Sequence, residues 1–171
     1  MSDFQEQVFS QRGGLKRLFS KVPGFKGYIE KEDRRTADKM LREVIADRYQ
    51  ELRQRISVIQ SNFVDQGKLE FLDELESIGT KLQTFIDRTR RATYGNTGFF
   101  SAIKIDEEKL DKLYAYDNFL LDGVEEISSA LETLEMATED EEIRQAIRTV
   151  DDLAKKSVQA ISRRKEVITT E

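Results

Sequence analysis

The sequence predicts an all-α protein: an antiparallel four-helix bundle of long helices, preceded by a short N-terminal amphipathic helical arm. Apolar residues recur at steps of three and four along four long stretches, which places them on one face of a helix. Charged residues make up 36% of the 171 residues and hydrophobic residues 38%, with a single proline. This balance is typical of long helices rather than of sheets. We therefore divide the chain into an arm, residues 1–29, and a bundle, residues 30–171.

The composition also narrows the classes of function. The chain has no histidine and no cysteine, which removes the commonest general base, the thiol nucleophile and the usual transition-metal ligands. We therefore expect a protein that is not an enzyme and that binds no metal or cofactor. No apolar stretch approaches the roughly 20 residues of a membrane span, and the N-terminus does not resemble a signal peptide. The expected location is the cytoplasm, with the inner face of a membrane as one site within it.

The arm contains a basic segment, residues 12–28, in a chain of formal net charge -5. Apolar side chains at positions i, i+3, i+4 and i+7 predict one face of a two-turn helix. Pro23-Gly24 should end this helix because the residue before a proline resists the α region. An extended or turn stretch is expected after it. The apolar face of the helix consists of Leu15, Leu18, Phe19 and Val22.

The first two long helices are expected at residues 31–66 and 68–93. Gly67 lies between them and can adopt the left-handed conformation that ends many helices. The inward residues of the first helix are expected to be Ala37, Leu41, Val44, Ile45, Tyr49, Leu52, Ile56, Ile59 and Phe63. Those of the second are expected to be Leu69, Leu72, Leu75, Leu82, Phe85 and Ile86.

The third and fourth long helices are expected at residues 106–137 and 139–168. Asp106 is a suitable N-cap for the third, and Thr138 with Glu141 has the T-x-x-E spacing of a capping box for the fourth. The inward residues of the third helix are expected to be Leu110, Leu113, Asp117, Leu120, Val124, Ile127, Leu131 and Leu134. Those of the fourth are expected to be Ile143, Ile147, Val150, Ala154, Ser157 and Ile161.

Similar helix lengths and short turns favour an intramolecular bundle. Two long hairpins that splay apart or pair between chains are the alternative. An up-down-up-down order brings the arm, the aromatic connection 94–105 and two arginine-rich helix ends to one end of the bundle. These helix ends contain Arg88, Arg90 and Arg91 in one case and Arg163, Arg164 and Lys165 in the other. Cations at helix C-termini also suit the helix dipole, and the aromatic connection can simply cap the bundle.

One inward position of the third helix carries a carboxylate, Asp117. A buried carboxylate is costly without partners, and we consider Ser157, Tyr49, Lys156 and Arg48 as candidates. The structural interpretation is a core polar layer, formed by Asp117 with Ser157, that fixes the register of the helices. The functional interpretation is a ligand or ion site in the bundle core.

The first functional hypothesis is a scaffold or adaptor that associates peripherally with membranes through the arm. Short basic amphipathic helices with aromatic residues lie on anionic membrane surfaces. The head groups would be contacted by Lys16, Arg17, Lys21 and Lys26. Insertion would come from Phe19, Val22 and Phe25, with Phe99 and Phe100 as a second contact.

The second hypothesis is a soluble protein-interaction module whose arm packs on the bundle. The third is a small-molecule sensor that uses a polar core site at Asp117. A homo-oligomer is compatible with the membrane hypothesis, since one short arm binds weakly. Nucleic acid is disfavoured as a partner by the sequence pI near 5.1. Burial of Leu15, Phe19 and Val22 against the bundle would favour the second hypothesis, and their exposure would favour the first.

Overall fold

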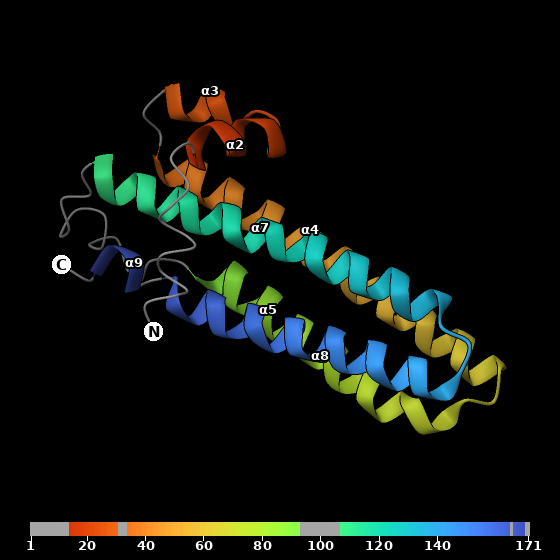
Figure 1. Cartoon of the computed structure of the whole chain (residues 1–171). Helices are drawn as coiled ribbons and strands as arrows, with labels where there is room; N and C mark the ends of the chain where they lie inside the picture. The colour runs from red at the N-terminus through yellow and green to blue at the C-terminus, as the bar shows by residue number, and fades with distance from the viewer. Residues whose placement is uncertain (1–13, 31–33, 93–106, 165, 170–171) are drawn as a thin grey trace.

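The described part of the chain is helical. The computed structural model describes residues 14–30, 34–92, 107–164 and 166–169 (Figure 1). The all-α class is confirmed for these residues. In chain order the elements are α2 (Gly14–Lys21), α3 (Phe25–Glu30), α4 (Arg34–Asp65), the 3-10 helix η1 (Leu69–Phe71), α5 (Leu72–Arg91), α7 (Glu107–Met136), α8 (Asp140–Arg163) and α9 (Glu166–Thr169).

The four long helices α4, α5, α7 and α8 pack as two hairpins laid against each other. α4 packs on α5 and α7 on α8, while the hairpins meet where α4 lies against α7 and α5 against α8. Helices within a hairpin run in opposite directions, but α4 and α7 run in the same direction, as do α5 and α8 (Figure 1). The prediction of antiparallel neighbours is therefore correct within each hairpin and wrong between the hairpins. The hairpins do not splay apart.

Polar contacts between the hairpins show the same parallel direction, because residue numbers rise together along both interfaces. The pairs are Tyr49 with Leu120 and Arg55 with Glu135 between α4 and α7, and Lys81 with Asp151 and Arg88 with Ser162 between α5 and α8.

The expected inward residues form the core. Those whose side chains are described are buried or half-buried, except Leu69, which is 59% exposed. Leu69 lies in η1, where the tighter turn does not follow the 3.6-residue period. The core also includes a second buried face of α7, with Tyr114 and Leu121. This face is buried because α2 and α9 both pack on α7.

The end of α4 lies where the sequence predicts it. Gly67 ends α4 with a φ of 74°. The N–H of Lys68 donates to the carbonyl of Phe63 at 2.9 Å and that of Gly67 to Val64 at 3.0 Å, the two hydrogen bonds of a Schellman motif. The Gly67 stop is thus confirmed.

The predicted capping box at the start of α8 is wrong. Glu139, and not Thr138, is the N-cap, and its side chain makes no capping hydrogen bond. The Thr138 carbonyl instead accepts a hydrogen bond from Lys68 Nζ at 2.8 Å, which ties the turn after α7 to the turn after α4. The first turn of α8 carries three acidic residues, which the helix dipole favours without a cap. The predicted N-cap Asp106 lies outside the described residues.

The fourth long helix is shorter than expected. α8 ends at Arg163 and is followed by the separate helix α9, whereas the sequence predicts one helix to residue 168. The backbone N–H of Arg164 donates to the carbonyl of Ile161, three residues earlier, at 3.4 Å, which is the spacing of a 3-10 turn. α9 then packs on α7.

The described part of the arm, α2 and α3, folds onto the side of α4 and α7 that faces away from α5 and α8 (Figure 1). α2 packs on α7 and α3 on α4. The Pro23-Gly24 break is confirmed, with Gly24 at a φ of 80°. The stretch after it is the helix α3 and not the extended or turn stretch that the sequence predicts.

Candidate functional site

The arm helices α2 and α3 cover the outer surface of α7 and α4 respectively, and this covered surface is called the arm groove here. The Phe25 ring meets the Tyr114 ring edge-on, with centroids 5.3 Å apart. Lys21 Nζ donates to Asp122 Oδ1 at 2.6 Å, and both side chains are partly exposed. The arm is thus held by an apolar contact and by a charged hydrogen bond at the C-terminal end of α2.

Besides Lys21, the candidate lipid contacts fall into three groups. The residues expected to insert face the core, since Val22 and Phe25 are fully buried and Phe19 is half-buried. Leu18 beside them is also fully buried. The basic residues Arg17 and Lys26 are exposed. Three candidates, Lys16, Phe99 and Phe100, lie outside the described side chains, as does Leu15 of the apolar face.

The arm groove continues past α2 as an open pocket of about 370 Å³. Lys21 lines the end of this pocket that adjoins α2, and the apolar floor consists of Leu52, Leu121 and Val124. The rims carry charges of both signs and one hydroxyl, from Arg48, Glu51, Arg55, Glu125 and Ser128.

A second feature is a buried ion cluster of Asp38, Arg42, Asp117 and Arg164, none of them more than 6% exposed. Arg164 donates from Nε to Asp117 Oδ1 at 2.6 Å and from Nη2 to Oδ2 at 2.7 Å. Its Nη2 also donates to Asp38 Oδ1 at 2.8 Å. Arg42 Nε completes the chain at 3.0 Å from Asp38 Oδ2. Two carboxylates and two guanidinium groups balance each other in charge.

The ion cluster joins all four long helices at the end where the arm attaches. Arg42 and Asp38 belong to α4, Asp117 to α7, and Arg164 follows α8. Arg42 Nη1 lies 3.2 Å from the carbonyl oxygen of Arg90 near the end of α5, where carbonyls lack helical partners. Because buried charges are expensive unless paired and hydrogen-bonded, the cluster fixes the relative positions of these helix ends.

The electrostatic environment of the cluster acts on two of its members. Burial, and secondly the charge of Asp38, raise the pKa of Asp117, while Arg42 opposes the shift. Burial likewise lowers the pKa of Arg164, against the influence of Asp38. The two-point contact between Arg164 and Asp117 has the short distances of charge-assisted hydrogen bonds, and it offsets this cost of burial.

The sequence identifies Asp117 as buried but not its partners. None of the four candidate partners contacts its carboxylate in the hydrogen bonds described, and Arg164 takes that place. By its place in the sequence, next to Arg163 and Lys165, Arg164 is expected to be a helix-end cation. The missed signal is periodic: Ser157, Ile161 and Arg164 continue the steps of four and three along the buried face of α8.

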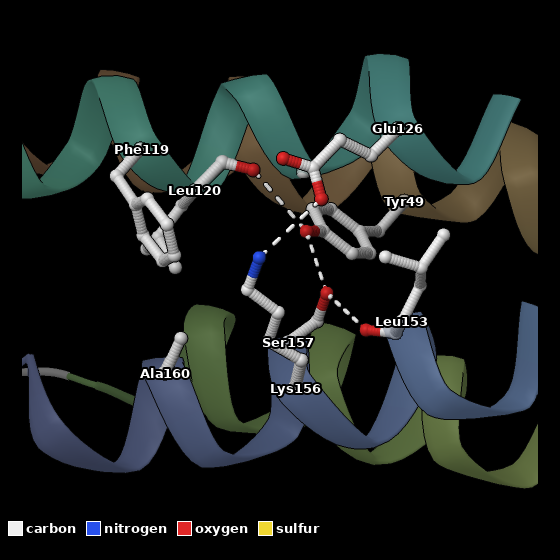
Figure 2. Close-up of a pocket in the computed structure, with 9 residues that line it drawn as sticks. Tyr49, Phe119, Leu120, Glu126, Leu153, Lys156, Ser157 and Ala160 are labelled. Atoms are coloured by element: carbon white, nitrogen blue, oxygen red, sulfur yellow. Dashed lines mark hydrogen bonds and ion pairs between the residues drawn. The ribbon is translucent and has the colours of Figure 1, made fainter. Parts of the chain in front are cut away.

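Ser157 belongs to a different polar contact, with Tyr49 (Figure 2). The Tyr49 hydroxyl lies 3.0 Å from Ser157 Oγ and 3.1 Å from the Leu120 carbonyl oxygen, and Ser157 Oγ lies 3.0 Å from the carbonyl oxygen of Leu153. Burial raises the pKa of Tyr49 above its ordinary value, with a smaller opposing effect from Ser157, so this phenol stays neutral. The predicted polar layer is therefore two separate contacts, one at Asp117 and one at Ser157.

Gly123 lets Tyr49 approach α7. A Cβ at this position would lie 2.7 Å from the Tyr49 hydroxyl oxygen, closer than side-chain atoms pack. The glycine thus admits the hydroxyl between α7 and α8, where it reaches both Leu120 and Ser157. The absence of a side chain at Gly123 is what allows α4, α7 and α8 to share this contact.

The pocket at this contact is small. Its volume for the centre of a water molecule is about 10 Å³, roughly the space of one water. Lys156 and Glu126 lie across it, 3.4 Å apart, beside the two hydroxyls (Figure 2). A pocket of this size has room for one water molecule but not for a larger ligand.

Comparison with protein-family models, with curated proteins and with solved structures gave no match to this chain. Within the described residues, no group of three or more acidic side chains is arranged to hold a metal ion. No helix in this part of the chain is both long and apolar enough to cross a membrane.

Proposed function

We propose that the chain is a non-enzymatic helical adaptor of the cytoplasm, in which two antiparallel hairpins close into a four-helix bundle that binds a protein partner. The observation that carries this proposal is the complete burial of Leu18, Val22 and Phe25, in the arm that packs on α7 and α4. The apolar face of the arm is used within the chain, so it is not displayed to a bilayer.

The non-enzymatic role is supported by composition and by the ion cluster. Histidine and cysteine are absent from the sequence, and general acid–base or nucleophilic catalysis most often relies on one of them. Both oxygens of the most deeply buried carboxylate, Asp117, accept hydrogen bonds from Arg164. That carboxylate is committed to holding helices together.

Membrane association is the competing function, and it has a structural cost. Val22 and Phe25 could insert into lipid only after the arm leaves its groove. Undocking would break the hydrogen bond between Lys21 and Asp122 and expose Tyr114. Burying a large apolar side chain is worth about 1.5–3 kcal/mol, so the docked arm favours the adaptor over the membrane scaffold.

Co-sedimentation with vesicles tests this choice. We expect the full-length chain to remain in the supernatant with phosphatidylserine-containing vesicles, as it does with phosphatidylcholine vesicles. The matched control is the double variant Arg17→Glu with Lys26→Glu, which reverses two exposed charges of the arm and should behave identically. Sedimentation with anionic vesicles that this double variant abolishes would replace the adaptor by the membrane scaffold.

A further inference from the structure

We propose that the arm groove is a helix-binding site that the chain's own arm keeps occupied, and that its partner is an amphipathic helix of the same kind as α2. This inference rests on the proposed adaptor function and names its binding surface. The partner displaces the arm and takes its place on α4 and α7.

The first support is that a helix already sits in the groove and shows what the groove accepts. Leu18 and Val22, four residues apart, are both fully buried, which is how an amphipathic helix anchors in a hydrophobic groove. Lys21, which is the last residue of α2 and directly precedes Val22, donates a hydrogen bond to Asp122 on the groove wall. The recognised pattern is thus two apolar anchors one turn apart with a lysine just before the second.

The second support is that the groove extends beyond its own ligand. α2 has eight residues and is therefore about 12 Å long. The open pocket of about 370 Å³ begins at Lys21 and continues between α4 and α7 over the apolar floor of Leu52, Leu121 and Val124. A partner helix can contact this floor while the arm is still docked, and it gains there a contact that α2 does not make.

That additional contact matters because the arm competes from within the same chain. A tethered segment acts at an effective concentration in the millimolar range. A separate helix that made only the contacts of α2 would rarely displace it. The pocket provides the additional contact that a separate helix needs to displace the arm. A mutation that weakens docking of the arm should likewise open the arm groove to a free peptide.

The probe is a fluorescent peptide with the sequence of residues 14–30, titrated into the full-length chain and followed by anisotropy. In the variant Val22→Asp, the new carboxylate would be buried in the arm contact, so the arm should undock while the groove stays intact. We expect this variant to bind the peptide at least tenfold more tightly than the unaltered chain does. Circular dichroism checks that the variant is still helical. If it is not, Lys21→Glu, at a partly exposed position, serves instead.

A charge swap distinguishes docking in the groove from non-specific apolar adhesion. Adding Asp122→Lys to the Val22→Asp chain should abolish binding of the unaltered peptide, and a peptide with Lys21→Glu should restore it. A helical variant that binds no peptide overturns the inference, as does equal binding of matched and mismatched peptides. These outcomes are independent of the vesicle result, so failure of the groove and failure of the adaptor function are distinguishable.

Discussion

Gly123 of α7 and Tyr49 of α4 would compete for the same space if the glycine carried a side chain. The hydroxyl oxygen of Tyr49 lies only 2.7 Å from where a Cβ of residue 123 would be, and the Tyr49 ring stacks on Phe85 with centroids 3.7 Å apart. The ring cannot easily move because it is fully buried and stacked on Phe85. The glycine and the tyrosine therefore act as one unit in the contact between the hairpins.

Gly123→Ala should destabilise the protein. Overpacking of this kind costs about 1–3 kcal/mol, which exceeds the roughly 0.5–1 kcal/mol that alanine gains over glycine inside a helix. Urea denaturation measures the change in the free energy of unfolding. Gly79→Ala is the matched control, since its Cβ would meet only Ile56 Cγ2 at 3.9 Å, and it should stabilise. In a Tyr49→Phe background the cost of Gly123→Ala should largely disappear; an unchanged cost would contradict the explanation.

Single-residue periodicity could predict which positions are buried but not which residues touch. Asp117 and Ser157 occupy inward positions and are both buried. The partner of an inward residue depends on how neighbouring helices are aligned along their axes. Because the start of the fourth helix near residue 138 and its end near residue 164 were predicted wrongly, this alignment could not be predicted correctly. Arg164 and Arg163 differ by about 100° around the helix. Only Arg164 continues the buried face of α8. Its neighbours in sequence are also basic, so the cluster has the appearance of a set of exposed helix-end cations.

The ion cluster connects the ends of four helices, so removing any one of its charged side chains should destabilise the protein. Arg164→Met would leave Asp117 and Asp38 buried without their shared cation, and removing one partner of a buried pair costs about 3–5 kcal/mol. Arg163→Met, one position earlier and exposed, should change the free energy of unfolding by less than about 0.5 kcal/mol. Thermal or urea unfolding compares the two. Equal stability of both variants would show that the cluster is not needed.

The contact between α5 and α8 includes Asp151, whose carboxylate forms ion pairs with two lysines. Asp151 lies 2.5 Å from Lys81 Nζ on α5 and 2.6 Å from Lys155 Nζ on its own helix. Burial alone would raise the pKa of Asp151, but the hydrogen bonds from Lys155 and Lys81 outweigh it and lower the pKa below its ordinary value of 3.8. The ionised form is therefore favoured in the folded state.

This shift fixes the sign of a pH dependence. A carboxylate with a lowered folded-state pKa contributes stability above its unfolded-state value, and this contribution is lost as the pH falls through the folded-state value. Asp151→Asn should lower the free energy of unfolding at pH 7 by about 0.5–1 kcal/mol, and the difference should shrink below pH 3.8. Asp152→Asn, at a side chain 79% exposed, is the control. A difference from the unaltered chain that does not vary with pH would exclude this explanation.

At the scale of the whole molecule, the sequence could predict the inward faces but not the order of helices around the core. A bundle in which α5 lies beside α7, and one in which α5 lies beside α8, bury the same faces of each helix. The tight turns specify each hairpin, as the contacts of α4 with α5 and of α7 with α8 confirm. The connection at residues 93–106 is longer and does not specify which helices of the two hairpins become neighbours. Side-chain pairs such as Lys81 with Asp151 select the order.

Carbodiimide cross-linking tests this order, because it joins lysine to carboxylate only where the two already touch. Mass spectrometry of the digested monomer should find Lys81 joined to Asp151, which lie 2.5 Å apart across α5 and α8. A cross-link between Lys156 and Glu126 serves as the internal control, since those residues lie 3.4 Å apart within the α7–α8 hairpin, and any order of helices preserves that hairpin. Lys81→Arg should remove the first product and leave the second. Cross-links from α5 to α7, in place of α5 to α8, would mean that the hairpins pack in the all-antiparallel order, and the parallel arrangement would be wrong.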